Sequence, residues 1–310
     1  MNAVFQNRGT FPSWRAIALP LLSCVLLPLF FVFKPTLLSA QEQPPVQSKL
    51  AIVASGVAAA EDAPLVAADY RFLPGDYVYF SFQIAGFTIT SSERGEVHKL
   101  SVTYEVSLQD MNGVPLVEPV SDSIQAEVNP EDKNWTPKRR ASFLLPSYLA
   151  SGMFRVHVAV KDLYAKAEIS KDYPFHLGGV DITPSASINV QHFQFFRRED
   201  DREPLEVPAY SPGDTVFARF DMAGFKFAPG NSYALEYGLS VTQPNGKTFL
   251  DAPHAAELKA SSFYPAQFLP GTVRITTPPN TAKGGYVLRL TVRDLTGNKT
   301  YETTKSFSIE

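Results

Sequence analysis

The chain has 310 residues, of which 45% are hydrophobic, 12% aromatic and 19% charged. This apolar content is enough for packed cores, so the composition excludes wholesale disorder, and the length allows roughly two domains at about 150 residues each. The formal net charge of −3 gives no electrostatic case for a nucleic-acid-binding protein.

The first 40 residues have the pattern of an export signal. Residues 1–15 contain Arg8 and Arg15 and no acid, and the 18 residues 16–33 are uncharged and mostly apolar. A small residue, Ala40, then precedes polar sequence, which predicts a signal peptide cleaved after Ala40. The apolar run also reaches membrane-spanning length, so an uncleaved anchor with a cytoplasmic N-terminus is the alternative. Both predict an exported chain: periplasmic, secreted or at the cell surface.

Cysteine occurs once, at Cys24. Residues 21–24 loosely resemble a bacterial lipoprotein box, but nine apolar residues follow where a lipid-anchored chain would turn polar. Removing residues 1–40 removes three basic residues and no acid, so the mature chain has 25 basic and 31 acidic residues, a net charge of −6. It also has no cysteine, which excludes thiol nucleophiles, cysteine-ligated zinc and a disulfide-held scaffold.

Residues 41–64 form a polar and then alanine-rich lead. Within it, the apolar patch Leu50–Val57 is a candidate for the first strand of the domain that follows. We place that first domain at residues 65–177, a linker at 178–187 and a second domain at 188–310.

The two domains are expected because one set of landmarks occurs twice in the same order. Pro-Gly-Asp at 74–76 recurs at 212–214, and Ala-Gly-Phe at 85–87 recurs at 223–225, both 138 residues on. Asn-Gly at 112–113 recurs 133 residues on, and the segment Val160–Leu163 recurs as Val292–Leu295 at an offset of 132. Such steady spacing predicts tandem homologous domains.

Segments between these landmarks alternate apolar and polar residues. The apolar stripes of the first unit are Val78, Phe80, Phe82 and Ile84; Leu100, Val102, Tyr104, Val106 and Leu108; and Phe154, Val156, Val158 and Val160. Their counterparts are Val216, Ala218, Phe220 and Met222; Leu235, Tyr237, Leu239 and Val241; and Tyr286, Leu288, Leu290 and Val292. A period of two with one polar face predicts half-buried antiparallel strands. Burying these stripes requires two packed sheets, so we predict an all-β fold of two tandem immunoglobulin-like antiparallel β-sandwiches.

The connectors agree with this fold. Proline followed by glycine before a strand is typical of a type II turn, and the two Asn-Gly pairs are hairpin signals. The opening pattern Pro-Gly-Asp-x-Val at 74–78 and 212–216, with closing strands that end at Phe175 and Phe307, resembles bacterial extracellular immunoglobulin-like modules of the fibronectin-III-like, adhesion and macroglobulin types. That resemblance implies a spacer, adhesion or binding module, and it carries over no functional residue.

Catalytic patterns are not found. The five histidines show neither a zinc-binding spacing nor a neighbouring histidine: His98, His157, His176, His192 and His254. The sequence has no nucleophile elbow and no glycine-rich phosphate loop. Asp162 and Asp294 end matching strands, where we interpret them as turn formers with a ligand role as the alternative. We therefore predict no enzyme, no catalytic or metal-binding residue and no cofactor.

Two surface features remain as candidates. The charged run Arg197–Glu203 could supply oxygen ligands to calcium, although its own arginines favour a solvated loop. Trp135, beside Lys138–Arg140, and the aromatic residues Phe263, Tyr264 and Phe268 could form a carbohydrate or peptide surface, or could anchor loops.

We therefore predict an exported, non-catalytic protein of two immunoglobulin-like domains that acts in protein interaction or envelope structure. The alternative is a pair of carbohydrate-binding modules that use Trp135 and the aromatics of 263–268. The expected partner is a protein or a cell-envelope component, with a glycan as the alternative and no nucleic acid. The membrane is involved only through an uncleaved N-terminal segment, and the binding residues are unknown.

Overall fold

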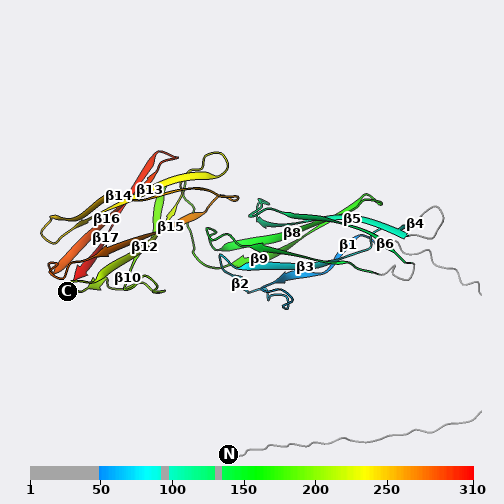
Figure 1. Cartoon of the computed structure of the whole chain (residues 1–310), viewed down its shortest axis with the longest axis horizontal. Helices are drawn as coiled ribbons and strands as arrows, with labels where there is room; N and C mark the ends of the chain where they lie inside the picture. The colour runs from blue at the N-terminus through cyan, green and yellow to red at the C-terminus, as the bar shows by residue number, and fades with distance from the viewer. Residues whose placement is uncertain (1–48, 92–97, 130–134) are drawn as a thin grey trace, which may run out of the picture. The chain divides into compact units, whose positions relative to one another are not determined.

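The computed structural model describes residues 49–91, 98–129 and 135–310, and its regular structure is entirely β (Figure 1). The predicted export signal, its cleavage site and Cys24 lie outside these residues. Among the residues described, no helix has the length and apolar character needed to cross a membrane.

The described residues of the first sandwich form nine strands. They are β1 (Ala51–Ala58), β2 (Arg71–Phe72), β3 (Tyr77–Ala85), β4 (Thr90–Ser91), β5 (His98–Asp110), β6 (Val120–Val128), β7 (Lys138–Leu144), β8 (Gly152–Asp162) and β9 (Ala167–Leu177). One sheet has the order β1-β3-β7, and the other has the order β2-β9-β8-β5-β4, with β6 also paired to β5. All pairs are antiparallel except the short β2, which runs parallel to β9.

The second sandwich repeats this plan. Its strands are β10 (Asn189–Phe196), β11 (Ala209–Tyr210), β12 (Thr215–Ala223), β13 (Ser232–Thr242), β14 (Thr248–Ser261), β15 (Phe268–Thr276), β16 (Gly284–Asp294) and β17 (Lys299–Ile309). The sheets have the orders β10-β12-β15 and β11-β17-β16-β13-β14, again with one short parallel pair, β11 with β17. The predicted fold class, two tandem immunoglobulin-like sandwiches, is confirmed.

The alternating stripes form the two cores, as the sequence predicts. In β3, Val78, Phe80, Phe82 and Ile84 are at most 1% exposed, and their counterparts in β12 are at most 2% exposed. Burying each large apolar side chain contributes roughly 1.5–3 kcal/mol to stability. This burial requires the second sheet to cover the apolar face of the first. Even the ring contacts repeat, because Phe82 meets Tyr104 edge-on at 5.4 Å and Phe220 meets Tyr237 edge-on at 5.3 Å.

The two Pro-Gly-Asp segments form identical turns. The N–H of Asp76 donates to the carbonyl of Leu73 at 3.0 Å, and Gly75 between them has φ of 91°. Asp214 and Gly213 repeat this arrangement, with φ of 95° at the glycine. Proline at the second position and a positive φ at the third define a type II turn, which confirms that prediction.

The first strand of the first domain lies in the alanine-rich lead. We placed the domain boundary at residue 65 with Leu50–Val57 as the candidate first strand, and the strand forms there: β1 pairs with β3 from Ala51 to Ala58 and Ile52 is buried in the core. The strand contains a bulge: Ala54 has φ of 44°, and the register shifts between Val53 and Gly56. The bulge interrupts the alternation of apolar residues, so the strand has a weak periodic signal.

Candidate functional site

The matched aspartates, Asp162 and Asp294, are each at most 2% exposed and hold three backbone N–H groups. The donors to Asp162 are the N–H groups of Thr88, Tyr164 and Ala165, at 2.6, 2.9 and 3.1 Å. The donors to Asp294 are the N–H groups of Lys226, Thr296 and Gly297, at 2.9, 3.1 and 2.8 Å. Each carboxylate thus closes its own hairpin turn and fastens the residue after the repeated Ala-Gly-Phe. We call this arrangement the aspartate clamp; its role is structural.

The charged run Arg197–Glu203 provides its own counter-charges. The N–H of Arg198 donates to Asp201 Oδ2 at 2.9 Å, and Arg198 Nε lies 3.4 Å from Asp201 Oδ1. Arg219, from β12, donates to the backbone carbonyl of Asp201. Among the residues described, no group of three or more His, Cys, Asp or Glu could hold a metal ion. These contacts favour the interpretation of the run as a solvated loop.

The aromatic residues of the segment 263–268 do not form one open surface. Tyr264 is 9% exposed, packs against the core of the first sandwich and donates its hydroxyl to Asp110 Oδ2 at 3.1 Å. Phe268 is 5% exposed and packs with Ala150 and Ala223. Only Phe263, at 54% exposed, stays open. The burial of Tyr264 and Phe268 favours the anchoring role over the alternative of a carbohydrate surface, because only Phe263 of these three is open to a ligand.

Backbone hydrogen bonds complete this junction. The N–H of Gln267 donates to the carbonyl of Tyr148 at 3.1 Å, and the side-chain oxygen of Gln267 accepts the N–H of Ala150 at 2.6 Å. Burial raises the pKa of Tyr264 to about 12, and the neighbouring Asp110 carboxylate adds to that shift. The hydroxyl therefore stays protonated and donates throughout the physiological range. We refer to Asp110, Tyr148, Ala150, Tyr264 and Gln267 as the junction.

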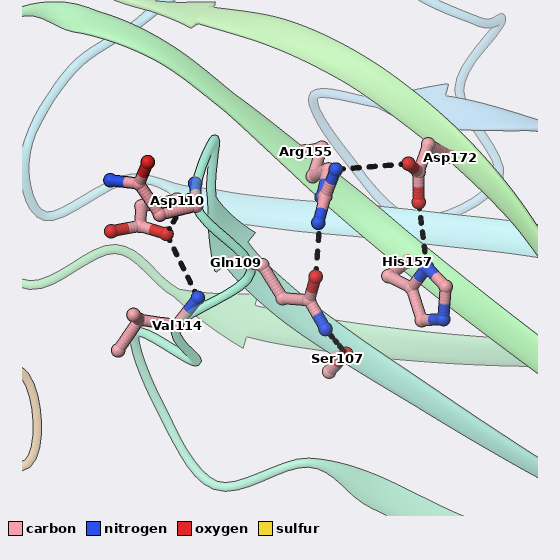
Figure 2. Close-up of polar contacts among 8 residues, drawn as sticks. Ser107, Gln109, Asp110, Val114, Arg155, His157 and Asp172 are labelled. Carbon is pink, nitrogen blue, oxygen red and sulfur yellow. Dashed lines mark hydrogen bonds and ion pairs between the residues drawn. The ribbon is translucent and has the colours of Figure 1, made fainter.

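A row of polar side chains crosses the outer face of β5, β8 and β9 (Figure 2). Gln109 donates to Ser107 Oγ at 2.7 Å and accepts from Arg155 Nε at 3.2 Å. Arg155 Nη1 donates to Asp172 Oδ2 at 3.0 Å, and the other oxygen of Asp172 lies 2.6 Å from His157 Nδ1. We call these five residues the polar row.

The polar row contains serine, histidine and aspartate, but it is not arranged as a hydrolytic triad. Ser107 lies opposite His157 in the β5–β8 register, yet its hydroxyl is bonded to Gln109. Ser107 is also only 1% exposed, so no substrate can reach it in this conformation. The accessible groups are Arg155, His157 and Asp172, a cation, an imidazole and an anion suited to hydrogen bonding with a partner surface.

The second sandwich has a different cluster on the corresponding face. Glu236 Oε2 lies 2.8 Å from His254 Nδ1, and Arg293 donates to the other oxygen of Glu236. The hydrogen bond from His254 lowers the pKa of Glu236, and Arg293 adds to the effect. At the positions of Arg155 and His157 this sandwich has instead Val287 and Arg289, by the constant offset of 132. The two outer faces have therefore diverged in charge, whereas the equivalent core positions are apolar in both sandwiches.

A third histidine pair lies on the smaller sheet. His192, in the bulge of β10 with φ of 51°, places Nδ1 3.0 Å from Asp221 Oδ2. Burial raises the pKa of Asp221, and the hydrogen bond from His192 partly opposes that shift. Three of the histidines thus lie on outer faces beside carboxylates that are distant in sequence, so no short motif indicates these pairs.

The sequence analysis does not predict the polar row, and of the junction residues it names only Tyr264. The row had a partial signal, because Ser107, Gln109, Arg155 and His157 occupy the outward positions of stripes that the sequence analysis assigns. The junction had none, since Tyr264 and Asp110 are 154 residues apart.

Comparison with known proteins yields no matching family model and no matching curated protein. Among solved structures, the chain is similar to the C-terminal domain of the Streptococcus pyogenes antigen I/II-family protein AspA, with 10% identity over 83% of this chain and 98% of that one and a TM-score of 0.29. The Streptococcus agalactiae AgI/II polypeptide BspA C-terminal domain gives 12% identity over 82% and 99%, with a TM-score of 0.28. The E. coli alpha-2-macroglobulin gives 12% identity over 86% of this chain and 17% of that one, with a TM-score of 0.25.

Proposed function

We propose that this chain is an exported, non-catalytic protein whose two immunoglobulin-like domains act together in binding another protein of the cell envelope. One observation carries the proposal. The aspartates that both repeats share bind their own backbone, whereas the charged outer faces differ between the repeats. A shared apolar core pattern with different charged surfaces is consistent with recognition, because specificity depends on the groups that a partner contacts.

The junction supports a joint action of the two domains. Tyr264 and Gln267 attach the second domain to the first through three hydrogen bonds, and Phe268 adds apolar contact. Because these contacts already restrict the relative motion of the two domains, less conformational entropy is lost when a partner binds both of them. The signal-like residues 1–40 support the exported location.

Site-specific photo-crosslinking in the native cell tests this function. A photoreactive residue replaces His157 on the polar row of the full-length protein, and the matched control carries it at Arg289, the same register position of the second sandwich. We expect an adduct of defined mass from position 157, and its loss when Arg155→Ala and Asp172→Ala are added. No adduct from position 157, or an adduct that persists when Arg155→Ala and Asp172→Ala are added, would contradict the proposal.

Mass spectrometry of the protein recovered from cell fractions tests location. We expect recovery outside the cytoplasm, with an N-terminus at residue 41 if the signal is cleaved. Recovery of the intact chain from the cytoplasm would contradict export.

A further inference from the structure

One edge of the first sandwich carries free backbone groups. Strand β7 is an end strand of the sheet β1-β3-β7. At its two ends, the carbonyl of Pro137 accepts the N–H of Ile84 at 3.2 Å, and the N–H of Leu145 donates at 2.9 Å to the carbonyl of Asp76, which directly precedes β3. Backbone groups of successive strand residues point to alternate sides. The residues whose N–H and C=O groups point away from β3 are therefore Lys138, Arg140, Ser142 and Leu144.

The equivalent edge of the second sandwich, on β15, is blocked twice. Pro270, which corresponds to Lys138, has no N–H to offer. The carbonyl of Thr272, which corresponds to Arg140, accepts the hydroxyl of Tyr237 at 2.9 Å. Proline protects an edge strand from pairing with another chain. A carbonyl that already accepts a hydrogen bond is likewise occupied when a further strand approaches.

The first sandwich lacks both devices. Tyr104, the counterpart of Tyr237, donates its hydroxyl to Asp122 at 3.2 Å instead. Within the described part of the chain, the outward N–H and C=O groups of Arg140, Ser142 and Leu144 make no hydrogen bond. Only the carbonyl of Lys138 is occupied, by the Arg139 side chain at 2.9 Å.

The side chains along β7 change from basic to apolar. Leu144 is 49% exposed and lies opposite Tyr77, which is 50% exposed. The second sandwich has Thr215 and Thr276 at this position, with their hydroxyls 3.3 Å apart, so the fold itself does not require the apolar pair. At the other end, Lys138 makes no ion pair in the described residues, and the nearby Glu61 and Asp62 pair with Arg140.

We propose that the free edge of β7 binds an extended segment of a partner protein as an added antiparallel or parallel strand. Main-chain hydrogen bonds to Arg140, Ser142 and Leu144 supply affinity, and alternate side chains supply specificity. The segment places an apolar side chain against Tyr77 and Leu144 and an acidic side chain near Lys138, by cross-strand complementarity. This inference rests on the proposed protein-binding function and names the partner's chemistry.

The test uses a displayed library of random linear peptides, selected on the full-length protein. We expect enriched peptides with an apolar residue at one end and an acid at the other. The best of these, as a synthetic peptide, should slow hydrogen exchange at the backbone N–H groups of Arg140, Ser142 and Leu144. Ser142→Pro removes one outward donor without touching the β3 ladder, and should weaken peptide binding about tenfold or more. Arg274→Pro, at the same register of β15, is the matched control and should change affinity by no more than about twofold.

A second variant keeps the test decisive if Ser142→Pro does not fold. Tyr77→Thr with Leu144→Thr installs the pair that the second sandwich already carries, and should weaken binding about tenfold. No enriched peptide, binding without slowed exchange in β7, or equal binding by the folded variants would overturn the inference. So would concentration-dependent self-association that slows exchange in β7, since a second copy would then occupy the edge. If any of these results occurs while the photo-crosslinking experiment still gives adducts from position 157, the strand-addition inference fails and the proposed protein-binding function does not.

Discussion

Asp294→Ala removes the aspartate clamp of the second domain. The substitution leaves three N–H groups, now bonded at 2.8 to 3.1 Å, without an acceptor at a site only 2% exposed. Each buried hydrogen bond to a charged group contributes about 1.5–3 kcal/mol, and the three are not fully additive because they share one carboxylate. We therefore expect the free energy of unfolding of this domain to fall by about 3–5 kcal/mol, out of about 5–15 kcal/mol for a typical domain.

The assay follows each domain separately. Urea unfolding monitored by hydrogen exchange and mass spectrometry gives the transition of each set of strands, and Trp135 fluorescence reports on the first domain alone if residues 1–40 are removed. Asp162→Ala should shift the first domain by a similar amount, because its clamp also holds three N–H groups. Asp214→Ala is the control, since that half-buried turn carboxylate accepts one N–H, from Ser211 at 2.8 Å, and should cost about 1 kcal/mol. A loss below about 1 kcal/mol for Asp294→Ala, or an equal shift of both domains, would refute the clamp.

Three further outcomes are expected. Tyr264→Phe deletes only the junction hydroxyl, so cross-domain protection in hydrogen exchange should weaken by about 1 kcal/mol while each core keeps its own transition. Burial raises the pKa of Tyr264 and of Tyr210 to about 12 from 10.0, so their contribution to stability is complete below pH 10 and is lost as the pH rises through 12. The urea midpoints should therefore fall over that pH range while the phenolate absorbance grows. Midpoints that stay level would contradict this expectation. Gly224→Ala forces a side chain at φ of 75° against the Ser187 carbonyl and should cost about 2 kcal/mol or more in thermal unfolding, whereas Gly246→Ala, at φ of 82° in open space, should cost about 1 kcal/mol.

The parts of the fold that sequence predicts are those set by local period and by repetition. The stripe Val78–Ile84 alternates without interruption, and its copy at Val216–Met222 confirms the register, so strand, face and core all follow. The first strand is harder, because the bulge at Ala54 breaks the period of two. The alanine-rich composition of that strand also gives little apolar contrast between its two faces.

The candidate site was less predictable for a physical reason. Tyr264 and Phe268 have the composition of a ligand-binding aromatic surface, and nothing near them in the sequence indicates the first domain as their partner. The polar row depends on three strands meeting in one register, so Arg155 and Asp172 become neighbours only after the sheet is assembled. The alternation of apolar residues predicts which side chains point outward, but it does not predict which outward side chains become neighbours on adjacent strands.

The aspartate clamps have a consequence for the order of folding. The bond from Thr88 to Asp162 spans 74 residues, and that from Lys226 to Asp294 spans 68. Closing such loops costs chain entropy before the contacts stabilise the chain, so we expect these contacts to form late, after the strands on either side have associated. An interaction that is absent from the transition state slows unfolding and leaves the folding rate unchanged. Each clamp should therefore determine how long its domain stays folded.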